Sequence, residues 1–432
     1  MISGQIIPLI LGIRPEFLLF ALTLLGVALF HRHSMIVALI GLCSILAFKF
    51  IFDPAFNLSE HLFGHVSFLD HVIHKDLRVV EWSTLLNLLG LLLCFAILSR
   101  HFEESGVPEY LPKLLPNDWK GPLVLLIAVF VLSSFLDNIA AALIGGSIAI
   151  VVFKRKVHLG YIAAIVAASN AGGSGSVIGD TTTTLMWIEG VHPFNVFHGY
   201  IAALTALAFF SVFASIQQDK YQRIQKDTKS DVVIDWTRLG IVVMILLMTI
   251  ATNVFFNFPA LGVWIALIIG GFIRKTDWAE AKRSIGGSIF LIALVTCASI
   301  MPVNELPVAS WQTAFSLGFV SSVFDNIPLT KMALEQNGYD WGMLAYAVGF
   351  GGSMIWFGSS AGVAITNKFH EARSVFGWLK SGWHILVAYI LGFFVLLFVM
   401  GWEPQPLKSK QNPEKTTQLI ENHSQVIVPT YK

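Results

Sequence analysis

Long apolar runs separated by short polar segments dominate this chain. A membrane-spanning helix needs about 20 predominantly apolar residues. The segments that approach this length are 16–31, 35–52, 82–99, 194–216, 238–257, 260–273, 285–303 and 382–401. We therefore expect an all-α polytopic membrane protein.

Four further apolar stretches carry polar interruptions near their middle. Residues 121–153 and 310–333 each contain the sequence Ser-Ser-x-x-Asp-Asn, and residues 158–190 and 341–367 each contain a run rich in Gly and Ser. Such backbone is tolerated at membrane depth only where protein or a water-filled cavity satisfies its polar groups. We predict re-entrant hairpins for the first two stretches and spanning helices with a central break for the other two.

The two halves of the chain repeat the same motifs in the same order. Ser-Ser-x-x-Asp-Asn-Ile occurs at 133–139 and 321–327, and Gly-Gly-Ser-x-x-x-x-Gly occurs at 172–179 and 351–358. Each half is expected to cross the membrane five times, and an odd number of crossings inverts the second half. Inverted repeats with discontinuous helices are typical of secondary transporters. The predicted units are a first repeat at 1–217, a cytoplasmic linker at 218–237, a second repeat at 238–402 and a disordered polar tail at 403–432.

Composition and charge narrow the class and suggest an orientation. Of the 432 residues, 55% are hydrophobic and 13% are charged, against about 25% charged in soluble domains, which argues against a soluble enzyme. The net charge of +1 gives no reason to expect a nucleic acid partner. If the hairpins do not cross, most Lys and Arg residues fall on one side, which we predict to be cytoplasmic. This places a multi-pass protein in the cytoplasmic (inner) membrane, among lipid, with both termini external.

Three carboxylates lie within apolar segments, at Asp137, Asp180 and Asp325. A charge at the bilayer centre costs at least about 2.5–3.5 kcal/mol, so such residues are functional candidates, although an Asp can also cap a helix fragment. Hard oxygen ligands suit a small hard cation. The predicted Na⁺ ligands are Asp137, Asn138, Asp180, Asp325 and Asn326. The full candidate set is Asp137, Asn138, Asn170, Asp180, Thr181, Thr182, Thr183, Ser321, Ser322, Asp325, Asn326, Ser359 and Ser360.

No buried cation is expected beside these carboxylates, because Lys154 and Lys331 fall at predicted helix ends, where their amines would reach the interface. A carboxylate that binds Na⁺ or Li⁺ can instead take up a proton, so the two ions compete for one site. That competition is sufficient for exchange. No cofactor is expected besides the transported ions.

Four short blocks carry a family resemblance. The segments 136–146 (Leu-Asp-Asn-Ile-Ala-Ala-Ala-Leu-Ile-Gly-Gly) and 169–184, with 321–326 and 358–362 in the second half, resemble NhaD-type sodium/proton antiporters. These belong to an ion-transporter superfamily that also holds arsenite permeases and citrate or dicarboxylate carriers. The resemblance implies exchange of Na⁺ or Li⁺ for H⁺, a homodimer, and an elevator-like moving domain. Asp-Asn stands where the dicarboxylate branch tends to have Ser-Asn-Thr, which favours a cation.

Two other functions remain open at this stage. One is a symporter or permease for a small anion such as citrate, a dicarboxylate or arsenite. The other is an intramembrane aspartyl protease, but these enzymes need Gly-x-Gly-Asp, and Val177 replaces the first Gly before Asp180. We therefore expect a transporter and not an enzyme.

Overall fold

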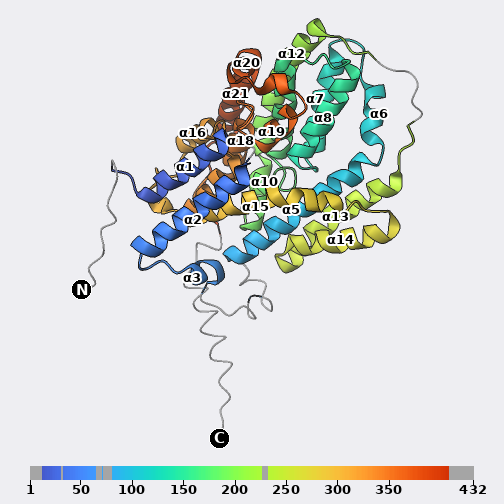
Figure 1. The fold of residues 1–432 in the computed structure, drawn as a ribbon. Coiled ribbons are helices and arrows are strands. Elements are labelled where there is room, and N and C mark those ends of the chain that lie inside the picture. Colours follow the sequence, from blue (N-terminus) through green and yellow to red (C-terminus); the bar gives the residue numbers. More distant parts are fainter. Residues whose placement is uncertain (1–11, 31–32, 65–70, 72–79, 226–231, 408–432) are drawn as a thin grey trace.

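A computed structural model describes residues 12–30, 33–64, 71, 80–225 and 232–407, and every regular element in this part of the chain is a helix (Figure 1). The first half contains α1 (Pro15–Leu29), α2 (Ser34–Phe52), α3 (Leu58–Phe63), α5 (Glu81–Glu103), α6 (Val107–Leu114), α7 (Lys120–Ser133), α8 (Asn138–Val152), α9 (Leu159–Gly173), α10 (Thr181–Ile188), α11 (Pro193–Phe197) and α12 (Gly199–Tyr221). The second half contains α13 (Trp236–Phe256), α14 (Pro259–Ile273), α15 (Ala279–Ser299), η3 (Val303–Glu305), α16 (Trp311–Ser321), α17 (Asn326–Gln336), α18 (Trp341–Gly351), α19 (Ser360–Thr366), η4 (His370–Arg373), α20 (Val375–Ser381) and α21 (Trp383–Met400).

Six helical segments of the described chain are long and apolar enough to cross a membrane. They are Ser34–Phe52, Glu81–Glu103, Pro193–Tyr221, Trp236–Phe256, Ala279–Ser299 and Trp383–Met400. Each coincides with a predicted span, and the other two predicted spans form the shorter apolar helices α1 and α14. The expectation of a polytopic, all-helical membrane protein is therefore confirmed.

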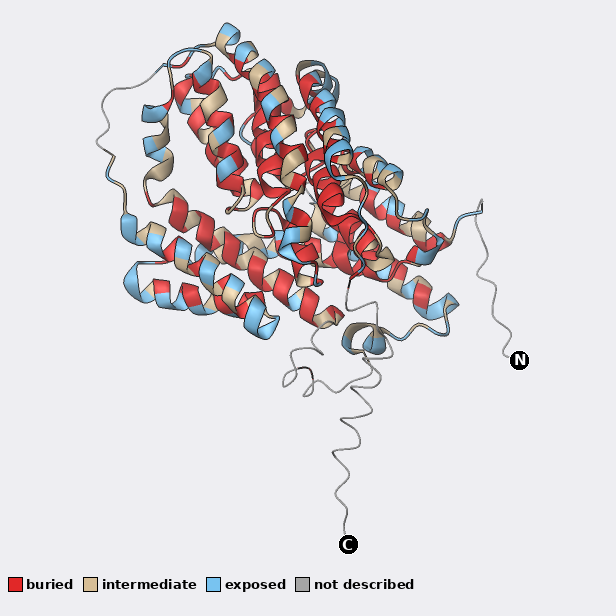
Figure 2. Ribbon diagram, turned by 180° about the vertical axis from the view of Figure 1, so that it is seen from behind, coloured by how far each residue is buried: buried red, intermediate tan, exposed pale blue. Residues whose placement is uncertain are grey.

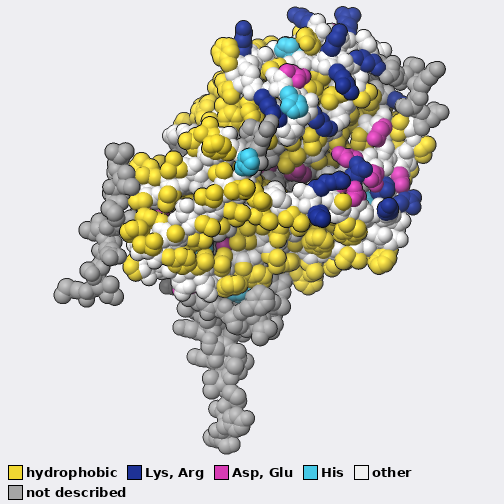
Figure 3. All heavy atoms as spheres, in the orientation of Figure 1, with side chains coloured by type: hydrophobic (Ala, Val, Ile, Leu, Met, Phe, Trp, Pro, Cys, Tyr) yellow, Lys and Arg dark blue, Asp and Glu magenta, His cyan; other side chains and the backbone are white. Residues whose placement is uncertain are grey.

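The outer helices expose large apolar side chains. Phe272 on α14 and Phe398 on α21 are 88% and 91% exposed, and hydrophobic side chains form a broad band over the lower part of the view in Figure 3. The buried residues instead gather where the central helices pack (Figure 2). This distribution suits a protein whose solvent at the perimeter is lipid hydrocarbon.

The two Ser-Ser-x-x-Asp-Asn segments form helix pairs. In the first, α7 ends at Ser133 and α8 begins at Asn138; in the second, α16 ends at Ser321 and α17 begins at Asn326. The polar residues between the helices expose the last carbonyls of one helix and the first N–H groups of the next. Both pairs therefore place a helix C-terminus and a helix N-terminus at their tips.

The two Gly- and Ser-rich segments interrupt a helix in each half. In the first half, α9 gives way to α10 over residues 174–180; in the second, α18 gives way to α19 over residues 352–359. The glycines allow close packing against the hairpin tips. A Cβ on Gly172 would lie 2.1 Å from the Phe130 carbonyl oxygen, and one on Gly358 would lie 2.4 Å from the Ser322 carbonyl oxygen.

The interrupted helices of one half pack against those of the other. Within each half, α7 packs on α9 and α16 packs on α18. Across the halves, α10 contacts α17 and α19 contacts α8. The second helix of each broken segment therefore rests on the second helix of the other half's hairpin. This reciprocal packing brings four helix N-termini, those of α8, α10, α17 and α19, toward one region.

Two predicted boundaries need correction or fall partly outside the described residues. Helix α12 continues to Tyr221, inside the predicted linker 218–237, of which 226–231 lie outside the described residues. The predicted disordered tail at 403–432 is wrong at its start, because 403–407 pack against the second half. The Trp341 indole N–H donates to the Gln405 carbonyl at 2.6 Å, and Leu407 is 2% exposed. Residues 1–11 and 408–432 are likewise outside the described part.

Candidate functional site

Polar side chains cap the helices that begin at the centre of the molecule. Asp180 precedes α10, and its Oδ1 accepts a hydrogen bond from the Thr182 N–H at 2.9 Å. Asp325 precedes α17 and accepts from the Ile327 N–H at 3.0 Å. Asp137 occupies the equivalent position before α8, and the N–H groups of the first residues of α8 interact with its carboxylate without forming a capping hydrogen bond of good geometry. Interactions with helix N-termini thus account for part of the role of all three carboxylates, through clear capping hydrogen bonds at Asp180 and Asp325 and weaker interactions at Asp137.

A chain of side-chain hydrogen bonds connects both halves at this point. The Asn138 amide donates to Asn170 Oδ1 at 3.0 Å and to Asp180 Oδ2 at 3.3 Å. The Asn170 amide in turn donates to Ser353 Oγ at 2.9 Å and to Ser359 Oγ at 3.1 Å. Asn170 and Asp180 are 0% and 1% exposed. The network therefore fixes the first hairpin, the first broken helix and the second broken helix in one buried arrangement.

The second hairpin joins the same region through its own carboxylate. Ser360 Oγ donates to Asp325 Oδ2 at 3.3 Å. Asp180 is close enough to interact electrostatically with both Asp137 and Asp325. Among the described residues, Asp137 Oδ1 and Thr182 Oγ1 are buried without a hydrogen-bond partner. Buried polar atoms seldom lack a partner in native proteins, and an ion is one explanation when they do.

The charges at this site do not balance. Each helix N-terminus contributes about half a positive charge, and each of α8, α10 and α17 begins beside one carboxylate. Three ionised carboxylates therefore exceed the positive ends of these three helices. A site of this kind attracts a cation or a proton more strongly than an anion.

The remaining predicted residues divide between the site and its supports. Thr181 Oγ1 lies 3.4 Å from Asp180 Oδ1, whereas Thr183 Oγ1 donates to the Ser176 and Asp180 carbonyls and holds the turn. Ser321 Oγ donates to the Val348 carbonyl at 2.7 Å, which ties the second hairpin to α18. Ser322 donates to the Phe319 carbonyl within its own helix. Asn326 is buried at the start of α17.

A cavity of 610 Å³ connects this region to one end of the molecule. At its inner part the lining includes Asp137, Thr181, Asp325, Ser359 and Ser360. At its other part the lining includes charged residues of α5 and α15, namely Arg100, Glu103, Glu280 and Arg283. Figure 3 shows Lys, Arg, Asp and Glu side chains gathered on the upper and right parts of this face, above the apolar band. Water and small ions therefore have a route to two of the three carboxylates.

Sequence reasoning missed two buried features of the structure. Ser353 accepts from Asn170, and the repeated Gly-Gly-Ser motif that contains it could have identified it. The expectation that Lys331 reaches the interface is wrong, because it is 0% exposed and its ammonium contacts Glu81 and Glu189 at 2.8 and 2.5 Å. A lysine surrounded by carboxylates from distant segments gives no local sequence pattern.

Comparison with known proteins agrees with this architecture. A family model described as a citrate transporter, CitMHS, matches residues 17–351. The Na(+)/H(+) antiporter NhaD of Alkalimonas amylolytica is 26% identical over 330 residues, covering 62% of this chain and 67% of that protein. NhaD of Vibrio cholerae is 27% identical over 329 residues, covering 62% and 68%. An uncharacterized transporter of Mycobacterium tuberculosis is 24% identical over 340 residues, covering 66% and 78%.

These matches confirm the resemblance seen in the short blocks of sequence. They identify the chain as a membrane carrier, which agrees with the expectation that it is not an enzyme. The family match also includes both hairpin tips and the first broken helix. Because that match extends over most of the chain, the protein belongs to the CitMHS family and is an ion transporter.

Proposed function

We propose that this protein exchanges Na⁺ or Li⁺ for H⁺ across the cytoplasmic membrane. The observation that carries the proposal is the clustering of Asp137, Asp180 and Asp325 at the centre of the molecule, with Asp137 and Asp325 lining the inner part of a cavity. Neutral hydroxyl oxygens lie nearby, since Thr181 and Ser360 contact Asp180 and Asp325, and Ser359 accepts from Asn170. A dehydrated alkali cation requires such a set of hard oxygen ligands.

Exchange follows from competition for the same oxygens. When Na⁺ leaves, the carboxylates carry excess charge in a buried place, and a proton restores neutrality. When Na⁺ enters, it displaces that proton. The Asn138 amide donates to Asp180 Oδ2 in the conformation described, and it can rotate away as the ion arrives. The predicted Na⁺ ligands on this account are Asp137, Asn138, Asp180, Asp325 and Asn326.

Alternating access would use the two halves as inverted repeats. The reciprocal contacts of α10 with α17 and of α19 with α8 support such a relation. We propose that the two helix pairs are re-entrant hairpins, and that hairpins and broken helices move as one elevator-like unit in a homodimer. The cavity end that carries Arg100 and Arg283 would face the cytoplasm, because basic residues prefer that side. The described conformation would then be open to the inside.

A small carboxylate anion is the second candidate substrate. The family description, citrate transporter, favours it, and helix N-termini are suited to anions. The three carboxylates at these N-termini argue against it, because they repel a di- or tricarboxylate. The relatives named Na(+)/H(+) antiporter also favour a cation.

An assay in everted membrane vesicles distinguishes the two candidate functions. The vesicles come from a host that lacks its own sodium/proton antiporters. After respiration acidifies the vesicle interior, addition of Na⁺ or Li⁺ is expected to dissipate the pH gradient. Vesicles from the same host without the protein serve as the control. Absence of dissipation between about pH 6 and 9, together with uptake of labelled citrate, would reject cation exchange.

A further inference from the structure

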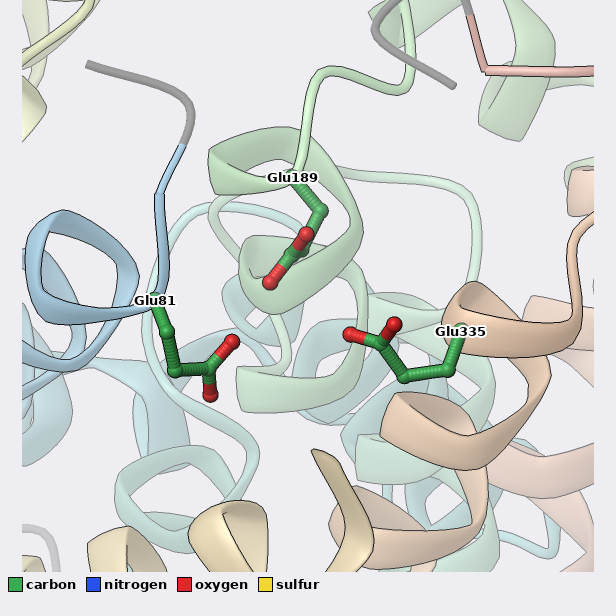
Figure 4. A group of neighbouring side chains, drawn as sticks. All are labelled: Glu81, Glu189 and Glu335. Carbon is green, nitrogen blue, oxygen red and sulfur yellow. The ribbon is translucent and has the colours of Figure 1, made fainter. Parts of the chain in front are cut away.

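A second cluster of ionisable residues lies outside the proposed ion site. Lys331 Nζ contacts Glu81 Oε2 at 2.8 Å, Glu189 Oε1 at 2.5 Å and Glu335 Oε1 at 2.9 Å. One carboxylate oxygen from each of the three glutamates lies within 4.8 Å of the others. Figure 4 shows the three carboxyl groups pointing toward one space from α5, the end of α10 and α17. Residues 81, 189 and 335 are far apart in the sequence, so the fold builds this cluster.

The cluster is distinct from the central carboxylates. Thr181 at the start of α10 lines the cavity, and Glu189 follows eight residues later, a rise of about 12 Å. On α5, Arg100 lines the cavity, while Glu81 begins the helix, about 28 Å away along the axis. The cluster thus lies beyond the ion site, on the side away from the charged part of the cavity lining.

Negative charge exceeds positive charge within this cluster. Lys331 is 0% exposed, and the side chains of Glu81 and Glu189 are each 8% exposed. Even with Glu335 left aside, the carboxylates of Glu81 and Glu189 exceed the Lys331 ammonium by one charge. A buried unbalanced charge is costly, so such a cluster takes up a compensating positive charge.

One oxygen of the cluster has no partner. Glu81 Oε2 receives the Lys331 ammonium, but Glu81 Oε1 is buried and accepts no hydrogen bond from any described residue. This is an independent indication of a missing cationic or hydrogen-bond donor. It locates the available position beside Glu81, next to the ammonium.

Other charged groups near this end pair elsewhere or carry the same sign, apart from His61, which interacts electrostatically with Glu335 and Lys331. Glu305 of η3 pairs with Arg14 at 3.0 Å, and Asp340 before α18 accepts from His198 at 2.6 Å. Helix α3 adds Glu60 and His61, and the His61 ring lies 3.0 Å from Ser299 Oγ. Among the Lys and Arg residues that the structure describes, Lys331 is the one that pairs with Glu81 and Glu189.

We propose that Glu81, Glu189 and Lys331 form a second site that binds one monovalent cation, either a proton or an alkali ion, at Glu81 Oε1. Both ions carry one positive charge and bind to a carboxylate oxygen. The site does not depend on which substrate the central carboxylates carry. The Lys331 ammonium neutralises one of the two carboxylates, so one negative charge remains for the bound cation to neutralise.

The test removes the central site first. In detergent-solubilised full-length protein that carries Asp137→Asn, Asp180→Asn and Asp325→Asn, equilibrium binding of ²²Na⁺ is measured with and without Glu81→Gln. Infrared difference spectra of the same variants monitor the C=O stretch of protonated carboxyl groups. Glu403→Gln, which changes an exposed glutamate, is the matched control.

Two results support the proposal and one overturns it. Loss of one equivalent of bound Na⁺ on Glu81→Gln identifies an alkali ion, and loss of one protonated-carboxyl band at neutral pH identifies a proton. If Glu81→Gln changes neither signal relative to Glu403→Gln, the second site does not exist. Because Glu81→Gln could unfold the protein, Lys331→Gln provides an independent test. It removes the Lys331 ammonium, so uptake of Na⁺ or H⁺ is expected to rise by one equivalent, and no rise would contradict the site.

Discussion

Replacing Asp180 by Asn separates its proposed ion-binding role from its structural role. Asn caps a helix about as well as Asp, so the hydrogen bond from the Thr182 N–H to the side chain at position 180 can persist. The substitution removes one negative charge from a residue that is 1% exposed. The fold is therefore expected to survive, and the attraction for a cation is expected to fall.

The size of that loss follows from electrostatics. Two unit charges 4 Å apart interact by about 4 kcal/mol at an effective dielectric constant of about 20. Since about 1.4 kcal/mol corresponds to a factor of ten in affinity, Asp180→Asn is expected to weaken Na⁺ binding by about 1,000-fold. Exchange is therefore expected to be lost at Na⁺ concentrations that saturate the wild-type protein.

The assay compares dissipation of the pH gradient in everted vesicles as a function of Na⁺ concentration, with protein levels measured in the same membranes. Asp340→Asn is the control for the capping role, because Asp340 also caps a helix, α18, but pairs with His198 and not with the central carboxylates. Wild-type Na⁺ dependence in Asp180→Asn would refute the assignment of its carboxylate to the ion. Failure of both variants to insert would mean instead that capping by Asp cannot be replaced by Asn here.

Four further predictions test other parts of the site. Asp137→Asn and Asp325→Asn are each expected to abolish exchange while the protein still inserts, and normal Na⁺ activity in both would contradict a shared carboxylate site. Asn138→Ala is expected to weaken Na⁺ binding by about 10-fold, since it removes the amide oxygen that we propose as a Na⁺ ligand; isothermal titration measures it, and an unchanged affinity would exclude a role for this amide. Gly172→Ala is expected to prevent correct folding, because its Cβ would lie 2.1 Å from a backbone oxygen of α7. In the control variant Gly287→Ala nothing lies within 4 Å of the new Cβ, so expression is expected to be unchanged. Equal thermal stability of the two variants would disprove the packing argument. The apparent KM for Na⁺ is expected to rise by up to about tenfold for each unit by which pH falls where one proton competes with one Na⁺, and a pH-independent KM would exclude competition.

The apolar pattern was sufficient to predict most of the helices. Runs such as 35–52 and 82–99 became α2 and α5 with ends shifted by a few residues. The reason is that a lipid environment leaves few options for a long apolar segment other than a helix. The repeated Asp-Asn and Gly-Gly-Ser motifs also indicated where helices end near the centre.

Tertiary contacts between distant residues could not be predicted in the same way. The bond from Asn138 to Asp180, or from Asn170 to Ser359, depends on how two separate broken helices meet. Lys331 illustrates the same difficulty, because its burial depends on Glu81 and Glu189, which appear at segment ends in the sequence. Residues 403–407 contain Glu, Gln and two prolines and are expected from the sequence to be disordered, yet hydrogen bonds between their backbone and the side chains of Trp341 and Asn337 hold them in place.

The most direct test of cation exchange uses purified protein reconstituted in liposomes with an acidic interior. We expect ²²Na⁺ to accumulate inside as protons leave, with both movements lost in Asp180→Asn. An external buffer that abolishes the pH gradient should also abolish Na⁺ accumulation. If Na⁺ does not accumulate although labelled citrate enters the same liposomes, the central carboxylates do not exchange Na⁺ for H⁺.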